Sequence, residues 1–261
     1  MSGALELRDL ARTVAADIST FLLAEVDQVH GVDTKSSATD LVTEIDRASE
    51  ARIVAAITAQ RPSDGFKGEE GTDASGTSGV RWIIDPIDGT ANFVLGHPGY
   101  GVSIAAEVDG TVVAGAVGDP VHGQLFDAAL GHGARCNGEP LAVRPTSELS
   151  RAVVATGFSF RPERRRTQAQ ALTTILPQVA DIRRMGSAAL DLCGVAVGRV
   201  DAYYELGLNE WDLAAGALIA AEAGADVRMP DLTAAADGVI VASAPGVTTQ
   251  LLDVLGKAGV L

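Results

Sequence analysis

The stretch WIIDPIDGTANF, residues 82–93, constrains the fold and the chemistry of this chain more than any other segment. It begins as an apolar run typical of a buried strand and ends in turn residues. Pro86 has no N–H to continue a sheet ladder and fixes φ at about −65°, so we expect the strand to end there. Asp85 and Asp88 would then leave the sheet together, and two nearby like charges need partners that neutralise them.

Length and composition are those of an ordinary globular protein. The 261 residues can bury a sizeable core, as one large domain or as two smaller lobes. Hydrophobic residues make up 47% and charged residues 21%, which excludes a disordered chain. No apolar run reaches the roughly 20 residues that cross a bilayer. Positions 1–18 mix charges into their apolar residues, unlike a secretory signal.

Cysteine usage and charge narrow the compartment and the partners. Cys136 and Cys193 are in no Cys-x-x-Cys spacing, which argues against a disulfide scaffold or a cysteine-ligated zinc site and predicts a cytoplasmic protein. The net charge of −14 disfavours nucleic acid or an anionic membrane as the main partner. One basic cluster, RPERRR at 161–166, is interpreted as a solvated segment that opens a helix, with contact to an anionic substrate as the alternative.

Periodicity predicts helices first and strands after them. Apolar residues at three- and four-residue steps predict a helix over 5–29, and a second helix is expected over 43–60. From 81 to about 143 the pattern indicates strands joined by hairpin turns at Asp109-Gly110 and Asn137-Gly138. This region therefore predicts antiparallel meanders.

After about residue 150 the pattern changes to alternating strands and helices. Strands are predicted at 151–156, 201–205 and 238–244, and helices at 163–179, 187–198, 213–224 and 247–258. We therefore predict a layered α+β protein, with an antiparallel N-terminal lobe over 1–150 and an α/β C-terminal lobe over 151–261.

The residues around Asp85 suit a hard cation. In such a turn Asp85, Asp88 and the carbonyl of Ile87 can point at one place, and oxygen ligands of this kind suit Mg²⁺. Gly89 and Thr90 would present N–H groups and a hydroxyl beside the metal, at a helix start that favours anions. The alternative is that Asp85 caps the turn and Asp88 caps a short helix, and the spacing alone favours it.

Three other acidic segments admit a structural or a metal-binding role. The pair Glu69-Glu70 ends a short extended piece and could be a solvated turn. Asp212 begins an Ala-rich helix and could be only an N-cap. Thr43 and Asp46 have the spacing of a capping box. Each segment is weak evidence for a metal site when it is taken by itself.

Taken in order, four segments closely resemble the inositol monophosphatase family: KSSATDLVTEID at 35–46, GEE at 68–70, WIIDPIDGTANF at 82–93 and EWDLAAGALIAAEAG at 210–224. The resemblance covers nearly the whole chain, and 185–207 is similar to the family's substrate-side region. The bacterial inositol-1-monophosphatase branch is the most similar. The family implies a layered αβαβα sugar-phosphatase-type fold and Mg²⁺-dependent, lithium-sensitive hydrolysis of phosphomonoesters, commonly by homodimers.

The resemblance implies two to three Mg²⁺ ions per active site. Glu69, Asp85 and the main-chain carbonyl of Ile87 would hold the first ion. Asp85 would bridge to a second ion, which Asp88 and Asp212 would also hold. A third, weaker ion would lie near Glu69 and be mostly water-bound.

The resemblance also implies roles around the reacting water, the phosphate and the polyol. Thr90, hydrogen-bonded to Asp46, would orient the attacking water, and Lys35 matches a family lysine close to this network. Gly89 and Thr90 would meet the phosphate. The polyol hydroxyls would face Gly186, Ser187, Ala188 and Glu205. Because a metal lowers the pKa of bound water, no histidine base is required.

Glu205 bears on the substrate. A carboxylate accepts hydrogen bonds from vicinal hydroxyls and repels a second phosphate, which favours myo-inositol monophosphate over a bisphosphate. Its structural alternative is an acidic residue that ends a strand. Histidinol phosphate, whose amine could pair with Glu205, and other sugar phosphates are alternative substrates. A metal-binding regulatory protein is the alternative outside enzymes, but the full ligand set argues against it. Glu210 is an additional carboxylate with no assigned role.

Overall fold

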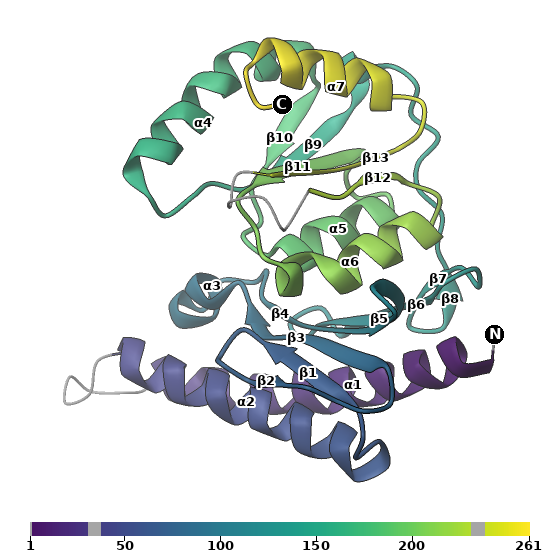
Figure 1. The fold of residues 1–261 in the computed structure, drawn as a ribbon. Helices are drawn as coiled ribbons and strands as arrows, with labels where there is room; N and C mark the ends of the chain where they lie inside the picture. The colour runs from purple at the N-terminus through teal and green to yellow at the C-terminus, as the bar shows by residue number, and fades with distance from the viewer. Residues whose placement is uncertain (1, 31–37, 231–237) are drawn as a thin grey trace.

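The structure, a computed structural model, describes residues 2–30, 38–230 and 238–261. Its elements stack as alternating layers of helices and sheets, in the order α-β-α-β-α (Figure 1). A helix pair covers one face of an eight-stranded sheet, two helices lie between that sheet and a five-stranded one, and two more cover the far face of the small sheet. The layered α+β fold predicted from the sequence is confirmed.

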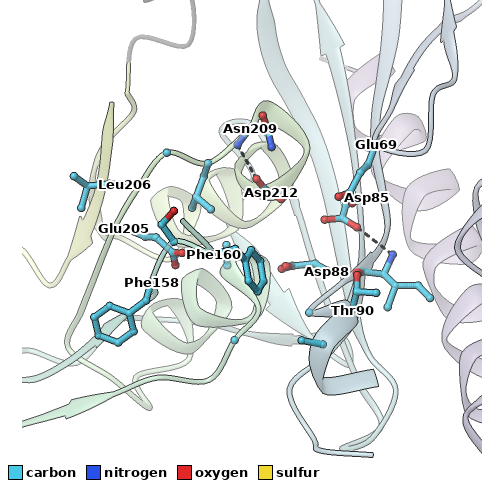
Figure 2. A pocket seen from close by; sticks show the side chains of 18 of the residues that line it. Glu69, Asp85, Asp88, Thr90, Phe158, Phe160, Glu205, Leu206, Asn209 and Asp212 are labelled. Atoms are coloured by element: carbon cyan, nitrogen blue, oxygen red, sulfur yellow. Dashed lines mark hydrogen bonds between the residues drawn. The ribbon is translucent and has the colours of Figure 1, made fainter. Parts of the chain in front are cut away.

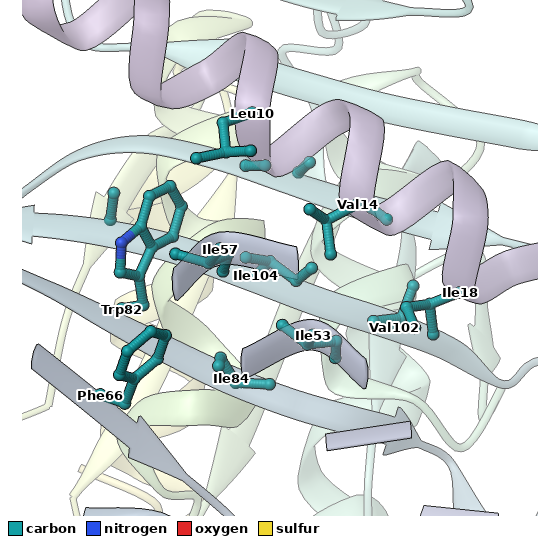
Figure 3. Packing of buried hydrophobic residues seen from close by; sticks show 14 of the residues in the cluster. Leu10, Val14, Ile18, Ile53, Ile57, Phe66, Trp82, Ile84, Val102 and Ile104 are labelled. Atoms are coloured by element: carbon teal, nitrogen blue, oxygen red, sulfur yellow. The ribbon is translucent and has the colours of Figure 1, made fainter. Parts of the chain in front are cut away.

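The outer layer consists of α1 (Ser2–His30) and α2 (Ala38–Gln60), which pack against each other and on the large sheet. The three- and four-residue spacing on α1 forms one buried stripe that meets Trp82 and Ile104 (Figure 3). The capping box predicted at Thr43 is wrong, because α2 begins five residues earlier and Thr43 lies inside the helix. Neither glycine nor proline separates Ala38 from Thr43 to end the helix.

The large sheet has the strand order β2-β1-β3-β4-β5-β6-β7-β8. All neighbours pair antiparallel except β1 and β3. Both predicted hairpin turns are confirmed, with φ of 50° at Asp109 and 51° at Asn137, each followed by a glycine of positive φ. The strands in chain order are β1 (Gly65–Gly68), β2 (Asp73–Ala74), β3 (Val80–Asp88), β4 (Gly101–Val108), β5 (Thr111–Asp119), β6 (Gln124–Ala129), β7 (Ala134–Cys136) and β8 (Glu139–Pro140).

Strand β3 does not end at Pro86, as the sequence predicts, but continues to Asp88. Asp85 pairs with Ser103 and Asp88 with Gly101, so three steps along β3 face two along β4 and the register shifts between them. A bulge of this kind leaves its extra residue out of the ladder, which is why the missing N–H of proline is tolerated there. Both aspartates therefore stay on the strand, on either side of the bulge.

The second half of the chain builds the other three layers. The small sheet has the order β10-β9-β11-β13-β12, with β9 parallel to β10 and β11 and the remaining pairs antiparallel. Its strands are β9 (Val153–Thr156), β10 (Asp181–Arg183), β11 (Ala202–Leu206), β12 (Asp226–Arg228) and β13 (Val239–Ser243). The helices are α3 (Thr90–Leu95), α4 (Pro162–Ile175), α5 (Ala188–Ala196), α6 (Glu210–Glu222) and α7 (Thr248–Lys257), with short 3₁₀ turns at Leu149–Arg151 and Leu176–Gln178.

Helix α6 lies between the two sheets and contacts both of them. It is buried on all sides from Leu213 to Ala220, which requires the uniformly apolar and small residues of its sequence. A Cβ on Gly115 of β5 would lie 3.0 Å from the Cα of Ala215, so the helix and the sheet are in close contact there. This packing fixes the first turn of α6 beside β3. No helix in the described ranges is long and apolar enough to span a membrane.

Candidate active site

A cavity of about 370 Å³ opens where β3 ends, beside the first turn of α6 (Figure 2). Four carboxylates, from Glu69, Asp85, Asp88 and Asp212, line one part of it. Its other walls come from the starts of α3 and α5, from the end of β11 and from the loops after β9, β10 and β11. The apolar side chains there are Phe158, Phe160, Leu206 and Leu208.

Three carboxylates from distant parts of the sequence meet in this cavity. One oxygen each of Asp85, Asp88 and Asp212 lie within 4.8 Å of one another. Asp85 is 1% exposed and Asp88 is 8% exposed. The sequence predicts these three residues together in one site, and the structure brings them together.

Asp85 and Asp212 are each held by a local hydrogen bond. Asp85 Oδ1 accepts from the Ile87 N–H at 3.0 Å, within the bulge. Asp212 Oδ2 accepts from the Asn209 N–H at 2.6 Å; Asn209 is therefore the N-cap of α6, and Asp212 is the third residue of the helix in the same capping box. The alternative that Asp212 is the N-cap is wrong, but its capping-box hydrogen bond is compatible with its place in the cluster.

Asp88 is held by the second half of the chain. Its Oδ2 accepts from the Ser187 hydroxyl at 2.6 Å and from the Ala189 N–H at 2.7 Å, at the start of α5. Ser187 is buried and caps α5 by accepting from the Leu190 N–H at 3.2 Å. It therefore supports Asp88 from behind instead of lining the cavity, where the sequence expects it to face the polyol.

Burial and mutual repulsion raise the pKa of all three carboxyl groups. Burial is the larger cause, and the neighbouring carboxylates add to it. The pKa rises to about 7 at Asp88 and to about 6 at Asp212, and it lies well above the usual range at Asp85. An all-oxygen set of mutually repelling carboxylates, two of them buried and one partly buried, fits a hard divalent cation, which would offset the repulsion and displace the protons.

Glu69 lies next to this cluster on the loop that leaves β1. Its N–H donates to the Ile84 carbonyl at 3.2 Å, and its negative charge adds to the burial and the Asp88 charge that raise the pKa of Asp85. The loop is shaped by Glu50 of α2, whose carboxylate accepts from the N–H groups of Glu70 at 2.9 Å and Thr72 at 3.0 Å. Sequence reasoning missed Glu50, which is buried; its four-residue spacing from Asp46, on the same face of the predicted helix, was the available signal.

The sequence predicts a hydrogen bond between Thr90 and Asp46, but the Thr90 hydroxyl donates to a different acceptor. Its hydroxyl donates to the Ile87 carbonyl at 2.9 Å, because the bulge brings that carbonyl over the first turn of α3. Asp46 is 5% exposed, and burial followed by repulsion from Glu70, Glu69 and Glu50 raises its pKa to about 8. Lys35 lies outside the described residues.

The other predicted substrate-side residues line the cavity. Gly89, Thr90, Gly186, Ala188 and Glu205 all do so. The Tyr203 hydroxyl donates to Glu205 Oε2 at 2.7 Å, and burial raises the pKa of Glu205 to about 7. Sequence reasoning missed Tyr203. Its two-residue spacing from Glu205 puts both on one face of the predicted strand, which was the available signal.

Glu210 and the basic cluster at 161–166 lie outside the cavity that holds the site carboxylates. Glu210 accepts from the guanidinium of Arg81, at 2.8 Å to Nη2, and does not line the cavity. The basic residues at 161–166 open α4 and are exposed except for Arg164, which agrees with their interpretation as a solvated helix start.

Comparison with known proteins matches residues 5–257 to the model of the inositol monophosphatase family. The inositol-1-monophosphatase SuhB of Mycobacterium tuberculosis is 44% identical and aligns with 96% of this chain and 93% of its own length. The Nus factor SuhB of Vibrio cholerae is 42% identical and aligns with 87% of this chain and 86% of its own length. The solved structure of Mycobacterium tuberculosis SuhB superposes with a TM-score of 0.86 at 43% identity and covers 97% of both chains.

Proposed function

Because the chain belongs to the inositol monophosphatase family, we propose that it is a Mg²⁺-dependent phosphatase that hydrolyses myo-inositol monophosphate to myo-inositol and phosphate. The observation that carries this proposal is the meeting of Asp85, Asp88 and Asp212 within 4.8 Å, in a cavity that also exposes Glu205. The cluster suits divalent cations, and Glu205 suits a hydroxyl-rich leaving group.

Five residues would hold two Mg²⁺ ions, with a third bound more weakly. They are Glu69, Asp85, Asp88, Asp212 and the carbonyl of Ile87. Bound Mg²⁺ supplies charge neutralisation at the phosphate and lowers the pKa of water. The carboxylates would contribute by binding as anions at neutral pH, although burial raises their pKa values in the free protein.

Thr90 would position the attacking water. Because its hydroxyl proton is donated to the Ile87 carbonyl, the lone pairs of Oγ1 stay available to accept a hydrogen bond from water. Asp46, near Glu69 and with a raised pKa, would complete this network together with Lys35. An in-line reaction requires mainly that the water and the phosphorus are held in place.

The phosphate would lie against the start of α3. Gly89 has φ of 92°, and a Cβ there would lie 2.6 Å from the Gly99 carbonyl oxygen, so only glycine fits this turn. The N–H groups of Gly89 and Thr90 would then donate to phosphate oxygens.

The polyol would lie on the side of the cavity formed by Gly186, Ala188 and Glu205. Tyr203 holds the Glu205 carboxylate in place, so Glu205 would accept from two neighbouring hydroxyls. Histidinol phosphate is the alternative substrate that this carboxylate also suits. We further propose a cytoplasmic, lithium-sensitive homodimer whose partner is a small phosphomonoester, without nucleic acid or membrane. A non-catalytic regulatory role is the second candidate function, because some relatives of this chain are named Nus factor.

The test compares phosphate release from four substrates with Mg²⁺ and with EDTA. The substrates are inositol 1-phosphate, histidinol phosphate, fructose 1,6-bisphosphate and adenosine 3′,5′-bisphosphate. We expect Mg²⁺-dependent release with the highest kcat/KM for inositol 1-phosphate. A far higher kcat/KM for histidinol phosphate would overturn the substrate assignment, and release from none of them would favour the regulatory role.

A further inference from the structure

The loop between β9 and α4 exposes a large aromatic side chain to water at the cavity. Phe160 is 83% exposed, which is the highest value for a large hydrophobic side chain in the described part of the chain. It nevertheless lines the same cavity as the carboxylates. An exposed apolar side chain is common on any surface, but one placed at a cavity wall is available to a ligand.

This loop is held in place by hydrogen bonds from α4. The Ser159 N–H donates to Gln168 Oε1 at 2.9 Å, and the Arg165 guanidinium donates to the Phe160 carbonyl at 3.0 Å. The Arg161 N–H donates to Ser159 Oγ at 3.1 Å. The backbone that carries the exposed ring is therefore fixed on both sides of Phe160.

The loop is also packed tightly against Glu205. A Cβ on Gly157 would lie 1.9 Å from Glu205 Oε2, so the backbone of the loop touches this carboxylate. The backbone that carries Phe160 is consequently held close to the Glu205 carboxylate, and both residues line the cavity (Figure 2). One wall can accept hydrogen bonds from hydroxyls, and the other offers a flat apolar surface.

A cyclic polyol has matching chemistry, with hydroxyls around its edge and C–H groups on its faces. The face of an aromatic ring carries negative electrostatic potential and attracts such C–H groups, in addition to the apolar area that is buried. We propose that Phe160 binds the C–H face of the ring in the alcohol part of the substrate, while Glu205 binds its hydroxyl edge. This inference rests on the proposed phosphatase function and names ring alcohols as its preferred leaving groups.

The space around Phe160 accommodates a ring and its substituents. A neighbouring cavity of about 220 Å³ is lined by Arg164, Thr167 and Gln168 of α4. Ser159 and Leu206 line both cavities, so the two adjoin at the loop that carries Phe160. The other possible occupant of this surface is a second copy of the chain, and the test below separates it from a substrate.

The test compares Phe160→Ala and Phe160→Tyr with the wild-type chain on two substrates. Inositol 1-phosphate has a ring, and glycerol 2-phosphate has none. We expect Phe160→Ala to raise KM for inositol 1-phosphate about tenfold with little change in kcat, because the apolar contact with the ring is lost. The KM for glycerol 2-phosphate should stay within about twofold of wild type. Phe160→Tyr should restore the wild-type KM for inositol 1-phosphate. Leu176→Ala, which removes an exposed side chain outside the cavity, is the control.

Equal effects on both substrates, or no effect on either, would overturn the inference. A change in mass by analytical ultracentrifugation, with KM unchanged, would assign Phe160 to a contact between two copies. Calorimetry of inositol 1-phosphate binding to the wild-type chain and to Phe160→Ala, in the presence of Ca²⁺, tests the ring contact independently of turnover. A wild-type chain that hydrolyses neither substrate would remove the proposed function, while this binding comparison still decides the role of Phe160.

Discussion

Asp88 shows how one residue connects the two halves of the site. It lies at the end of β3, yet its carboxylate is held by Ser187 and Ala189 of α5. The carboxylate that accepts these hydrogen bonds also belongs to the cluster of three carboxylates. Its negative charge is therefore the property that the proposed function requires, whereas its hydrogen bonds require only an acceptor.

Replacing Asp88 by Asn separates these two properties. The amide oxygen still accepts from Ser187 and Ala189, and a buried charge with a raised pKa is removed, so we expect the metal-free variant to melt no lower than wild type. Turnover should fall by about 100-fold or more because a proposed metal ligand is lost. Thermal melting in EDTA and kcat/KM with Mg²⁺ check the two halves of this prediction. An active variant would contradict the assignment of Asp88 to the metal.

The raised pKa values predict how stability depends on pH. Between about pH 4 and pH 7 the folded protein binds more protons at Asp88 and Asp212 than the unfolded chain, so the free energy of unfolding falls as pH rises. Metal-free protein should therefore melt at a higher temperature at pH 5.5 than at pH 7.5. With Mg²⁺ this decline should shrink or reverse, because cations compete with protons for the same carboxylates. Melting curves that decline equally in EDTA and in Mg²⁺ would argue against the site.

The meeting of site residues was predictable where the sequence motif itself carries them. Asp85, Asp88 and Asp212 meet as the family resemblance implies. The residues that support the site were harder to predict: Glu50 holds the loop that carries Glu69 by accepting from backbone N–H groups 20 and 22 residues further along the chain. The hydrogen bond donated by Thr90 depends on a bulge in β3, which no residue spacing reveals.

Strand β3 and helix α6, which carry the three aspartates, are joined by an ion pair between Arg81 and Glu210. Arg81 of β3 pairs across the sheet with Glu107, at 3.1 and 2.9 Å, which fixes its guanidinium. The same group donates to Glu210, in the first turn of α6, at 2.8 and 3.3 Å. Arg81 lies four residues before Asp85 and Glu210 two before Asp212, so this pair fixes the helix start relative to the strand.

Loss of this link should loosen the metal site. We expect Glu210→Gln to weaken Mg²⁺ affinity about tenfold, because Asp212 would be less well positioned although no proposed ligand is removed. Calorimetry of Mg²⁺ binding is the measurement. Asp253→Asn, which breaks the exposed pair with Lys257 far from the cavity, is the matched control. Identical Mg²⁺ affinity in Glu210→Gln and wild type would show that the pair plays no part in positioning Asp212.

Element boundaries were predicted best where local chemistry sets them. The hairpin turns at Asp109 and Asn137 and the cap at Ser187 follow from the residues themselves. The three-residue strands β10 and β12 were missed because they lie at the edges of the small sheet and have too few residues for a periodic pattern. Pairing across the sheet, which local sequence does not contain, also extended β3 past Pro86.

At the scale of the whole molecule, the middle layer determines how the lobes depend on each other. Helices α5 and α6 come from the second half of the chain, yet Ala215 and Ile219 are buried against Ile83 and Val117 of the large sheet. The sequence predicts alternating layers, but it does not show that these helices serve both sheets. The division into lobes over 1–150 and 151–261 remains a prediction.

This sharing predicts that the lobes do not fold separately. A fragment of residues 1–150 would expose the face of the large sheet that α6 covers, so we expect it to lack a cooperative melting transition, whereas the whole chain should melt in a single one. Circular dichroism and two-dimensional NMR of the fragment check this. Dispersed amide signals and a sharp transition from the fragment would show that the first lobe is independent.

The central claim is that the cluster of Asp85, Asp88 and Asp212 serves Mg²⁺-dependent hydrolysis of inositol phosphate. The most direct measurement is the rate of phosphate release from inositol 1-phosphate by the wild-type chain as Mg²⁺ is titrated from zero, after treatment with EDTA. We predict no release without metal and a saturable rise with Mg²⁺ that Asp212→Asn abolishes. Release that is unchanged by EDTA, or that persists in Asp212→Asn, would contradict the claim.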